Sequence, residues 1–178
     1  QFNGENEANP YALKKLKEIL GGQSSSNGMN IYIGERGDKS VRKFNKFIPK
    51  QEEGYFLRIT PNEIVLAGND ERGTFYAIQT LKQLLKNNQL PITEITDYPE
   101  IRFRGVVEGF YGTPWSHQAR LRHLKFYGEN KMNTYIYGPK DDPYHSSPNW
   151  RLPYPEQEAK QIKELVQVAK ENAVNFVW

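Results

Sequence analysis

The second half of the chain alternates short apolar runs with amphipathic helical stretches, and this alternation constrains the fold more than any other feature. Apolar runs at 103–107, 134–137 and 174–178 predict three strands. Between them, residues 117–131 and 155–172 carry apolar side chains at helical spacing. Strands joined by helical crossovers run parallel, so this half predicts an α/β unit with a parallel sheet.

The first half predicts a smaller α/β domain that ends near residue 98. Its expected elements are a helix at 10–20, a strand at 29–33, a hairpin at 55–60 and 63–67, and a helix at 71–86. The segments expected to lack regular structure are a polar lead-in at 1–9, a loop at 23–28, a basic connection at 35–50, and a proline-flanked link at 93–100.

The basic connection could be taken for a nucleic-acid contact surface. It contains Arg36, Lys39, Arg42, Lys43, Lys46 and Lys50 against two acidic residues. No recognition motif accompanies these charges, and the formal net charge of the whole chain is only +3. We therefore expect a solvated, partly irregular segment and no nucleic-acid partner.

Composition excludes several chemistries. The absence of cysteine rules out disulfide scaffolds, thiolate nucleophiles and cysteine-ligated metal sites. The three histidines have no metal-binding spacing, so no metal or other cofactor is predicted. No apolar run approaches the roughly 18 residues that a membrane span needs. No secretion signal stands at Gln1, and we expect a periplasmic or secreted protein whose signal peptide has been removed.

Two polar and aromatic loops follow the first two strands of the second half, at the sheet edge where α/β proteins bind ligands. In residues 108–115, two glycines flank Phe110 and Tyr111, which would let a ligand approach the backbone. In residues 137–145, Lys140 could donate hydrogen bonds to a ligand, and the following Asp-Asp could form an acid/base pair. Each loop also has a purely structural interpretation. Residues 108–115 could form a tight turn with packed aromatic side chains, and residues 137–145 a charged loop turned by its prolines.

Three segments carry a resemblance to a known family. Residues 104–116, RGVVEGFYGTPWS, resemble the opening strand of family-84 glycoside hydrolases, the O-GlcNAcases, some of which were first described as hyaluronidases. Residues 133–142, NTYIYGPKDD, resemble that family's second barrel strand and loop. Residues 71–81, ERGTFYAIQTL, resemble the helix of the small domain that precedes the barrel in families 84 and 20. The resemblance spans nearly the whole chain and is closest to enzymes of Bacteroides-like gut bacteria.

The resemblance implies a fold and an activity. Residues 1–98 would be the N-terminal α/β domain, and residues 101–178 the first three strands of a truncated (β/α)8 TIM barrel. The parent would be a retaining exo-β-N-acetylglucosaminidase that acts on GlcNAc-bearing glycans or glycoproteins. The substrate's own acetamido oxygen would attack the anomeric carbon and form an oxazoline, a known exception to the two-carboxylate scheme of glycosidases.

The same resemblance assigns site residues. Gly109 would accept a sugar hydroxyl through its backbone carbonyl, Lys140 would bind sugar hydroxyls, and Tyr111 would line the pocket. The catalytic aspartate pair is expected beyond Trp178, at the end of the fourth strand, so these 178 residues alone would be inactive. Asp141 and Asp142 match a different family position, and we expect them to structure their loop.

Two alternatives remain open at this stage. A hyaluronidase or another endo-acting hexosaminidase would need subsites beyond the first sugar. A non-catalytic carbohydrate- or protein-binding module would instead use the aromatic loops for stacking.

Overall fold

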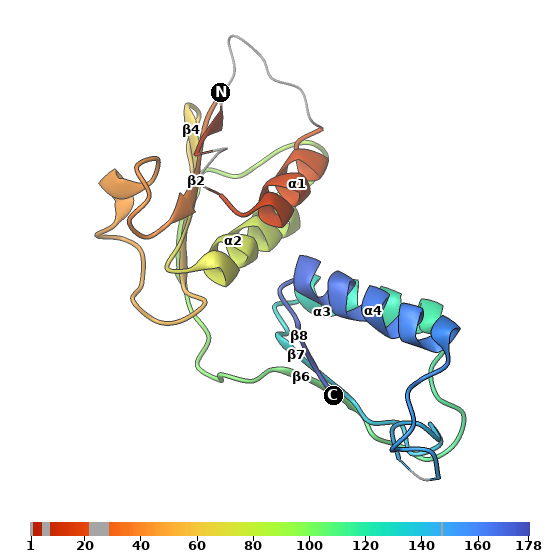
Figure 1. Ribbon diagram of the computed structural model, residues 1–178. Helices are drawn as coiled ribbons and strands as arrows, with labels where there is room; N and C mark the ends of the chain where they lie inside the picture. The colour runs from red at the N-terminus through yellow and green to blue at the C-terminus, as the bar shows by residue number, and fades with distance from the viewer. Residues whose placement is uncertain (1, 5–7, 22–28, 147) are drawn as a thin grey trace. The chain divides into compact units, whose positions relative to one another are not determined.

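The computed structural model describes residues 2–4, 8–21, 29–146 and 148–178, and the chain divides into two compact units. Unit 1 comprises Gln1–Glu100 and unit 2 comprises Ile101–Trp178 (Figure 1). The loop expected at 23–28 lies outside the described residues. None of the helices in the described ranges combines the length and the apolar character that a bilayer crossing requires.

Unit 1 is built on a five-stranded mixed sheet in the order β1-β2-β4-β3-β5. Its strands are β1 (Phe2–Asn3), β2 (Asn30–Glu35), β3 (Tyr55–Ile59), β4 (Glu63–Gly68) and β5 (Thr93–Asp97). β1, β2 and β4 run parallel, whereas β3 runs antiparallel to both β4 and β5. The predicted hairpin is therefore confirmed as β3 and β4. Unit 1 has a mixed α/β architecture.

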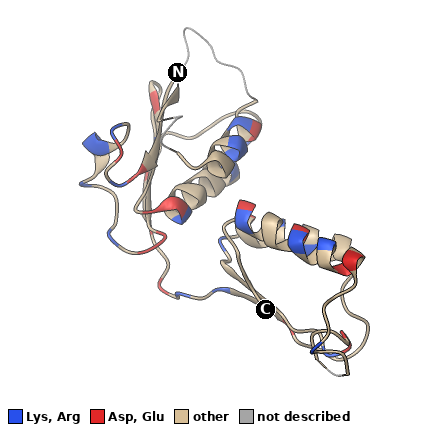
Figure 2. Cartoon of the chain, in the orientation of Figure 1, with Lys and Arg blue, Asp and Glu red and all other residues tan. Residues whose placement is uncertain are grey.

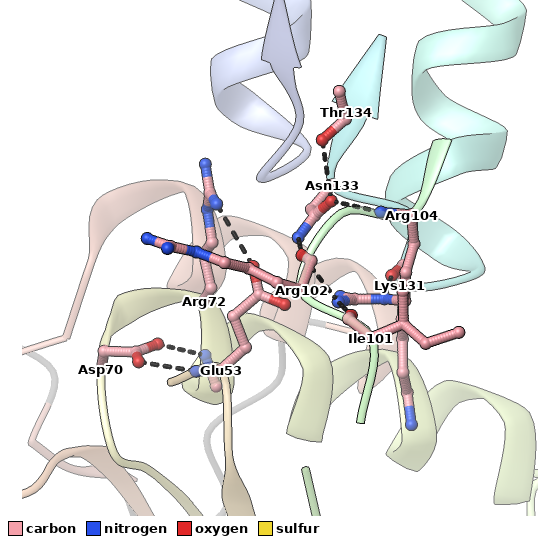
Figure 3. A network of polar contacts seen from close by, with 10 residues as sticks. Glu53, Asp70, Arg72, Ile101, Arg102, Arg104, Lys131, Asn133 and Thr134 are labelled. Carbon is pink, nitrogen blue, oxygen red and sulfur yellow. Dashed lines mark hydrogen bonds and ion pairs between the residues drawn. The ribbon is translucent and has the colours of Figure 1, made fainter. Parts of the chain in front are cut away.

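Helices α1 (Pro10–Ile19) and α2 (Glu71–Leu84) cover one face of this sheet (Figure 1). Both begin at a side chain that accepts hydrogen bonds from the first turn, as polar N-cap residues do. Asn9 Oδ1 accepts from the Tyr11 N–H at 2.8 Å. Asp70 accepts from the Gly73 N–H (2.9 Å) and also from the Glu53 N–H (2.7 Å), which ties the start of α2 to the approach to β3 (Figure 3).

The opposite face of the unit 1 sheet is covered by the basic connection. Residues 39–50, which we call the turn layer, include the 3₁₀ helix η1 (Arg42–Phe44). Val41, Phe44 and Ile48 are buried in one cluster with residues of β3 and β4. The expectation of a merely solvated segment is therefore wrong for these three side chains, because the sheet needs an apolar cover on this side too.

Two segments expected to lack regular structure contain strands. Phe2–Asn3 pairs with β2 in parallel, and a strand of two residues is too short to produce a detectable alternation. Thr93–Asp97, predicted to be part of a link, pairs with β3 along its whole length. The prolines on either side favoured the prediction of a link, although proline also occurs at edge strands and at strand ends.

Unit 2 contains a three-stranded parallel sheet in the order β6-β7-β8, as predicted. Its elements are β6 (Gly105–Glu108), α3 (His117–Glu129), β7 (Thr134–Tyr137), α4 (Glu156–Glu171) and β8 (Asn175–Val177). Helices α3 and α4 lie on one face of the sheet (Figure 1). The core between helices and sheet contains Leu124, Tyr135 and Leu165.

The other face of the unit 2 sheet carries exposed apolar side chains. Val107, Ile136 and Val177 are 60%, 36% and 40% exposed. Only the side chains that alternate with these three face the helices.

A group of hydrogen bonds joins the segments that precede β6 and β7, at the amino end of the unit 2 sheet (Figure 3). Asn133 Oδ1 accepts a hydrogen bond from the Arg104 N–H (2.9 Å), while its amide group donates to the Arg102 carbonyl (2.7 Å). The Arg104 guanidinium in turn donates to the Lys131 carbonyl (3.0 Å). These contacts fix the point at which β6 enters the sheet.

Candidate carbohydrate site at the carboxyl ends of β6 and β7

The loops that follow β6 and β7 are tied together through their backbones, and they contain the three predicted site residues. The Gly138 N–H donates to the carbonyl of the last β6 residue at 3.0 Å, which extends the strand pairing into the loops. Beyond it, the Lys140 N–H donates to the Phe110 carbonyl at 3.2 Å. Phe110 stands between Gly109 and Tyr111 in the chain. The structure therefore brings all three predicted residues to one place.

The exposed groups at this place suit a ligand that arrives from solvent. The Tyr111 side chain is 82% exposed, and Lys140 is exposed as well. A Cβ atom at Gly109 would lie 3.2 Å from the Val107 side chain, on the sheet face that α3 and α4 leave uncovered. The absence of a side chain there leaves the backbone open to close approach.

Asp142 is a buried carboxylate that organises the β7 loop. It accepts four hydrogen bonds, from the hydroxyls of Tyr137 and Tyr154 (2.9 Å for Tyr154) and from the N–H groups of Tyr144 (2.9 Å) and His145 (3.2 Å). Burial alone would raise the pKa of Asp142, but these hydrogen bonds outweigh it and hold the pKa below its ordinary value. A carboxylate so occupied has little capacity left for a ligand.

Asp141 has a different partner. Its Oδ2 accepts a hydrogen bond from the Gly112 N–H at 2.9 Å, which joins the β7 loop to the β6 loop. The two carboxylates are therefore held by separate partners. The expected loop-structuring role of Asp141 and Asp142 agrees with these contacts.

The sequence did not single out Glu108, the residue that anchors the β6 loop. Its side chain is fully buried and lies on the helix-covered side of the sheet. Arg120 on α3 donates two hydrogen bonds to its carboxylate, from Nε at 2.9 Å and from Nη2 at 2.7 Å. The Trp115 N–H at 3.1 Å and the Tyr135 hydroxyl donate as well. One carboxylate thus joins β6, its loop, α3 and β7.

This contact set perturbs the ionisable groups around it. Burial alone would lower the pKa of the Arg120 guanidinium, but its hydrogen bonds to Glu108 outweigh burial and raise it. Burial raises the pKa of Tyr135, and the hydrogen bond to Glu108 raises it further. The network is therefore a fixed ion pair with a neutral phenol at neutral pH, which is a structural anchor rather than an acid/base couple.

A cavity of about 290 Å³ lies between these loops and the helices. Its lining includes His117, Arg120, Asp141, Asp142 and Tyr154. The described lining contains none of the three predicted site residues, so this cavity is distinct from the predicted sugar site. Within the described ranges, no group of three or more His, Cys, Asp or Glu side chains is arranged to hold a metal ion.

Both units match known protein families. Residues 104–178 match the family described as beta-N-acetylglucosaminidase, and residues 5–98 match glycosyl hydrolase family 20, domain 2. The solved structure of CpGH84B is similar over 95% of this chain, with a TM-score of 0.84 and 43% sequence identity. That of CpGH84D is similar over 99%, with a TM-score of 0.82 and 31% identity.

The chain belongs to glycoside hydrolase family 84. Its unit 1 contains the domain described as glycosyl hydrolase family 20, domain 2, which matches residues 5–98. The chain covers 31% and 33% of the two solved structures, so it represents about a third of each.

Curated relatives agree with the family. The protein O-GlcNAcase of Rattus norvegicus is 40% identical over 74 residues, which are 42% of this chain and 8% of the relative. The beta-hexosaminidase of Porphyromonas gingivalis is 33% identical over 109 residues, which cover 52% of this chain and 14% of the relative. The chain thus spans a small part of the curated proteins that it matches.

Proposed function

We propose that this family 84 chain is part of a longer retaining β-N-acetylglucosaminidase that removes O-linked GlcNAc. In this proposal the β6-β7-β8 sheet is the beginning of a (β/α)8 barrel. The exposed apolar face at Val107, Ile136 and Val177 supports it. In a complete barrel this face would point into the interior and pack against apolar side chains of the other strands.

One observation carries the assignment of the site. The backbone N–H of Lys140 donates to the Phe110 carbonyl, so the chain at Lys140 lies beside the loop that contains Gly109 and Tyr111, at the carboxyl ends of adjacent parallel strands. Barrel enzymes bind their substrates at this end. In the proposed complex, the Gly109 carbonyl accepts a hydrogen bond from a sugar hydroxyl, Lys140 donates to sugar hydroxyls, and Tyr111 borders the pocket.

The proposed reaction proceeds through substrate assistance. The acetamido oxygen of the substrate attacks the anomeric carbon while the glycosidic bond breaks, and water then opens the oxazoline with overall retention. An aspartate pair outside this chain would orient the acetamide and move the proton. The residues of this chain hold the sugar ring and contribute no proton transfer. Export to the periplasm or the medium is also proposed, and fractionation of the native cells tests it.

The test uses the longer protein and 4-nitrophenyl β-N-acetylglucosaminide. We expect release of 4-nitrophenol, and inhibition by a thiazoline that mimics the oxazoline. Lys140→Ala should lower kcat/KM by about 10- to 100-fold, because a hydrogen bond from a charged group contributes roughly 1.5–3 kcal/mol. Lys163→Ala, on the exposed surface of α4, is the matched control and should leave kcat/KM unchanged.

Three outcomes contradict parts of the proposal. The absence of 4-nitrophenol release would refute the activity. Equal kinetics for Lys140→Ala and Lys163→Ala would refute the position of the sugar. Cleavage of hyaluronan in preference to a GlcNAc-bearing peptide would replace the exo-acting enzyme with an endo-acting one.

A further inference from the structure

The turn layer of unit 1 concentrates positive charge in a way that the proposed hydrolase does not use. Residues 39–50 contain five Lys and Arg side chains and no Asp or Glu. All five are exposed: Lys39, Arg42, Lys43, Lys46 and Lys50. Residues 1–100 contain as many acidic as basic residues, so this charge is a local concentration rather than a property of the unit as a whole.

The apolar residues of the same segment explain why the cations point outward. Val41, Phe44 and Ile48 are buried in a cluster with the β3 and β4 side chains Phe56 and Val65. The intervening positions must therefore face solvent. Figure 2 shows blue segments on this layer, on the side of the sheet away from α1 and α2.

Backbone contacts hold the layer in a fixed shape. The guanidinium of Arg36 donates to the carbonyls of Asn45 (3.2 Å) and Pro49 (3.3 Å), and also to that of Ile48. Its Nε donates to Asn69 Oδ1 at 2.8 Å, which connects the layer to the end of β4. A binding surface that is rigid before its ligand arrives loses less conformational entropy on binding.

Some of the cations are positioned further by aromatic rings. The Lys43 ammonium lies 3.9 Å from the centroid of the Tyr32 ring, and that of Lys46 lies 4.7 Å from the Phe47 centroid. The protein's own cations thus cover these ring faces. Bases of a single-stranded nucleic acid would find no free ring here on which to stack.

We propose that the turn layer binds an anionic polysaccharide, one that carries sulfate or carboxylate groups along its length. A rigid array of exposed cations attracts such a polymer and releases its counterions, without the need for a deep pocket. The choice of a polysaccharide over a nucleic acid rests on the covered rings and on the proposed function. The surface would hold the enzyme on the polymer that carries or surrounds its substrate.

The test measures binding of the longer protein to heparin, by fluorescence titration between about 50 and 200 mM salt. One variant combines Lys39→Glu, Arg42→Glu, Lys46→Glu and Lys50→Glu. Lys43 is left unchanged, because it lies 3.8 Å from Glu63. The control combines Lys82→Glu, Lys86→Glu, Lys163→Glu and Lys170→Glu, which are exposed on or next to helices and give the same net charge.

We expect the turn-layer variant to bind heparin at least about tenfold more weakly at 50 mM salt, and the slope of log K against log salt to flatten by about three. The control variant should lose less than about threefold, since its charges are outside the proposed contact. Thermal unfolding of both variants verifies that they fold, and a set of Lys/Arg→Gln changes at the same four positions replaces any variant that does not.

Equal losses in the two variants would overturn the proposal, since net charge alone would then explain binding. Failure of the unmodified chain to bind heparin would overturn it too. Equally tight binding of single-stranded DNA of random sequence would assign the surface to nucleic acid instead. No step of this test involves hydrolysis, so its result and that of the proposed activity are independent.

Discussion

Replacement of Glu108 by glutamine should destabilise unit 2 far more than the change of one atom suggests. The carboxylate is fully buried and receives four hydrogen bonds, two of them from Arg120, whose side chain is only 11% exposed. Glutamine would leave that guanidinium buried without a counter-charge and would turn an NH₂ group toward N–H and O–H donors. Loss of one partner from a buried ion pair costs about 3–5 kcal/mol.

A double-mutant cycle separates the ion pair from the rest of the site. Arg120→Met leaves the Glu108 charge buried with half of its donors, so it should cost a similar amount, about 3–5 kcal/mol. The double variant removes both charges together and should be more stable than the sum of the single losses predicts, with a coupling of roughly 2 kcal/mol or more. Tyr135→Phe removes one donor to the charged carboxylate and should cost about 1.5–3 kcal/mol.

Urea unfolding followed by tryptophan fluorescence is the appropriate assay. All three tryptophans, Trp115, Trp150 and Trp178, belong to unit 2, so the signal reports on that unit selectively. If the losses from Glu108→Gln and Arg120→Met simply add in the double variant, the two side chains act independently and the reasoning fails. A loss below about 1 kcal/mol for Glu108→Gln would likewise show that the carboxylate is not the anchor described above.

Three further predictions concern other contacts. The pKa of Asp142 is lower in the folded state than in the unfolded chain, so its contribution to stability is present above about pH 4 and is lost as the pH falls below that value. Asp142→Asn should therefore reduce the pH dependence of the free energy of unfolding in urea between about pH 5 and pH 3, and an unchanged pH dependence contradicts the assignment. Gly73→Ala should destabilise unit 1 by about 2 kcal/mol in thermal unfolding, although alanine favours helices, because the new Cβ would lie 2.1 Å from the Gly54 carbonyl oxygen; a gain in stability would show that the backbone gives way. Asn133→Ala should lower the stability of unit 2 by about 2 kcal/mol in the fluorescence assay, since it strands the Arg104 N–H and a backbone carbonyl, and an effect below about 0.5 kcal/mol argues that water replaces the amide.

The sequence predicted the parts of the site that depend on chain order. Gly109 and Lys140 each follow a strand of one parallel sheet, and parallel strands necessarily end at a common edge. The partnership of Glu108 with Arg120 could not be predicted, because no spacing rule relates the end of a strand to the first turns of the next helix. A usable signal did exist: a charged residue closes an otherwise apolar strand, on the side that alternation assigns to the helices.

The elements of unit 1 were predicted unevenly for similar reasons. The β3–β4 hairpin is specified locally, by its alternation and by the Pro61-Asn62 turn between its strands. β5 depends instead on a distant partner, and the hydrogen bond from the Tyr55 hydroxyl to Asp97 (2.8 Å) is the kind of contact that only the folded sheet reveals. The turn layer shows the same limit, since its apolar residues are three and four positions apart without forming a long helix.

The internal pairing of unit 1 has a consequence for the order of events during protein synthesis. Each strand from β1 to β5 finds its partner within the first hundred residues, so this sheet can close while later residues are still being added. The β6-β7-β8 sheet emerges afterwards with Val107, Ile136 and Val177 uncovered on one face. A nascent chain that pauses at this stage would show an apolar strand surface to the cytosol, and chaperone capture should be strongest in that interval.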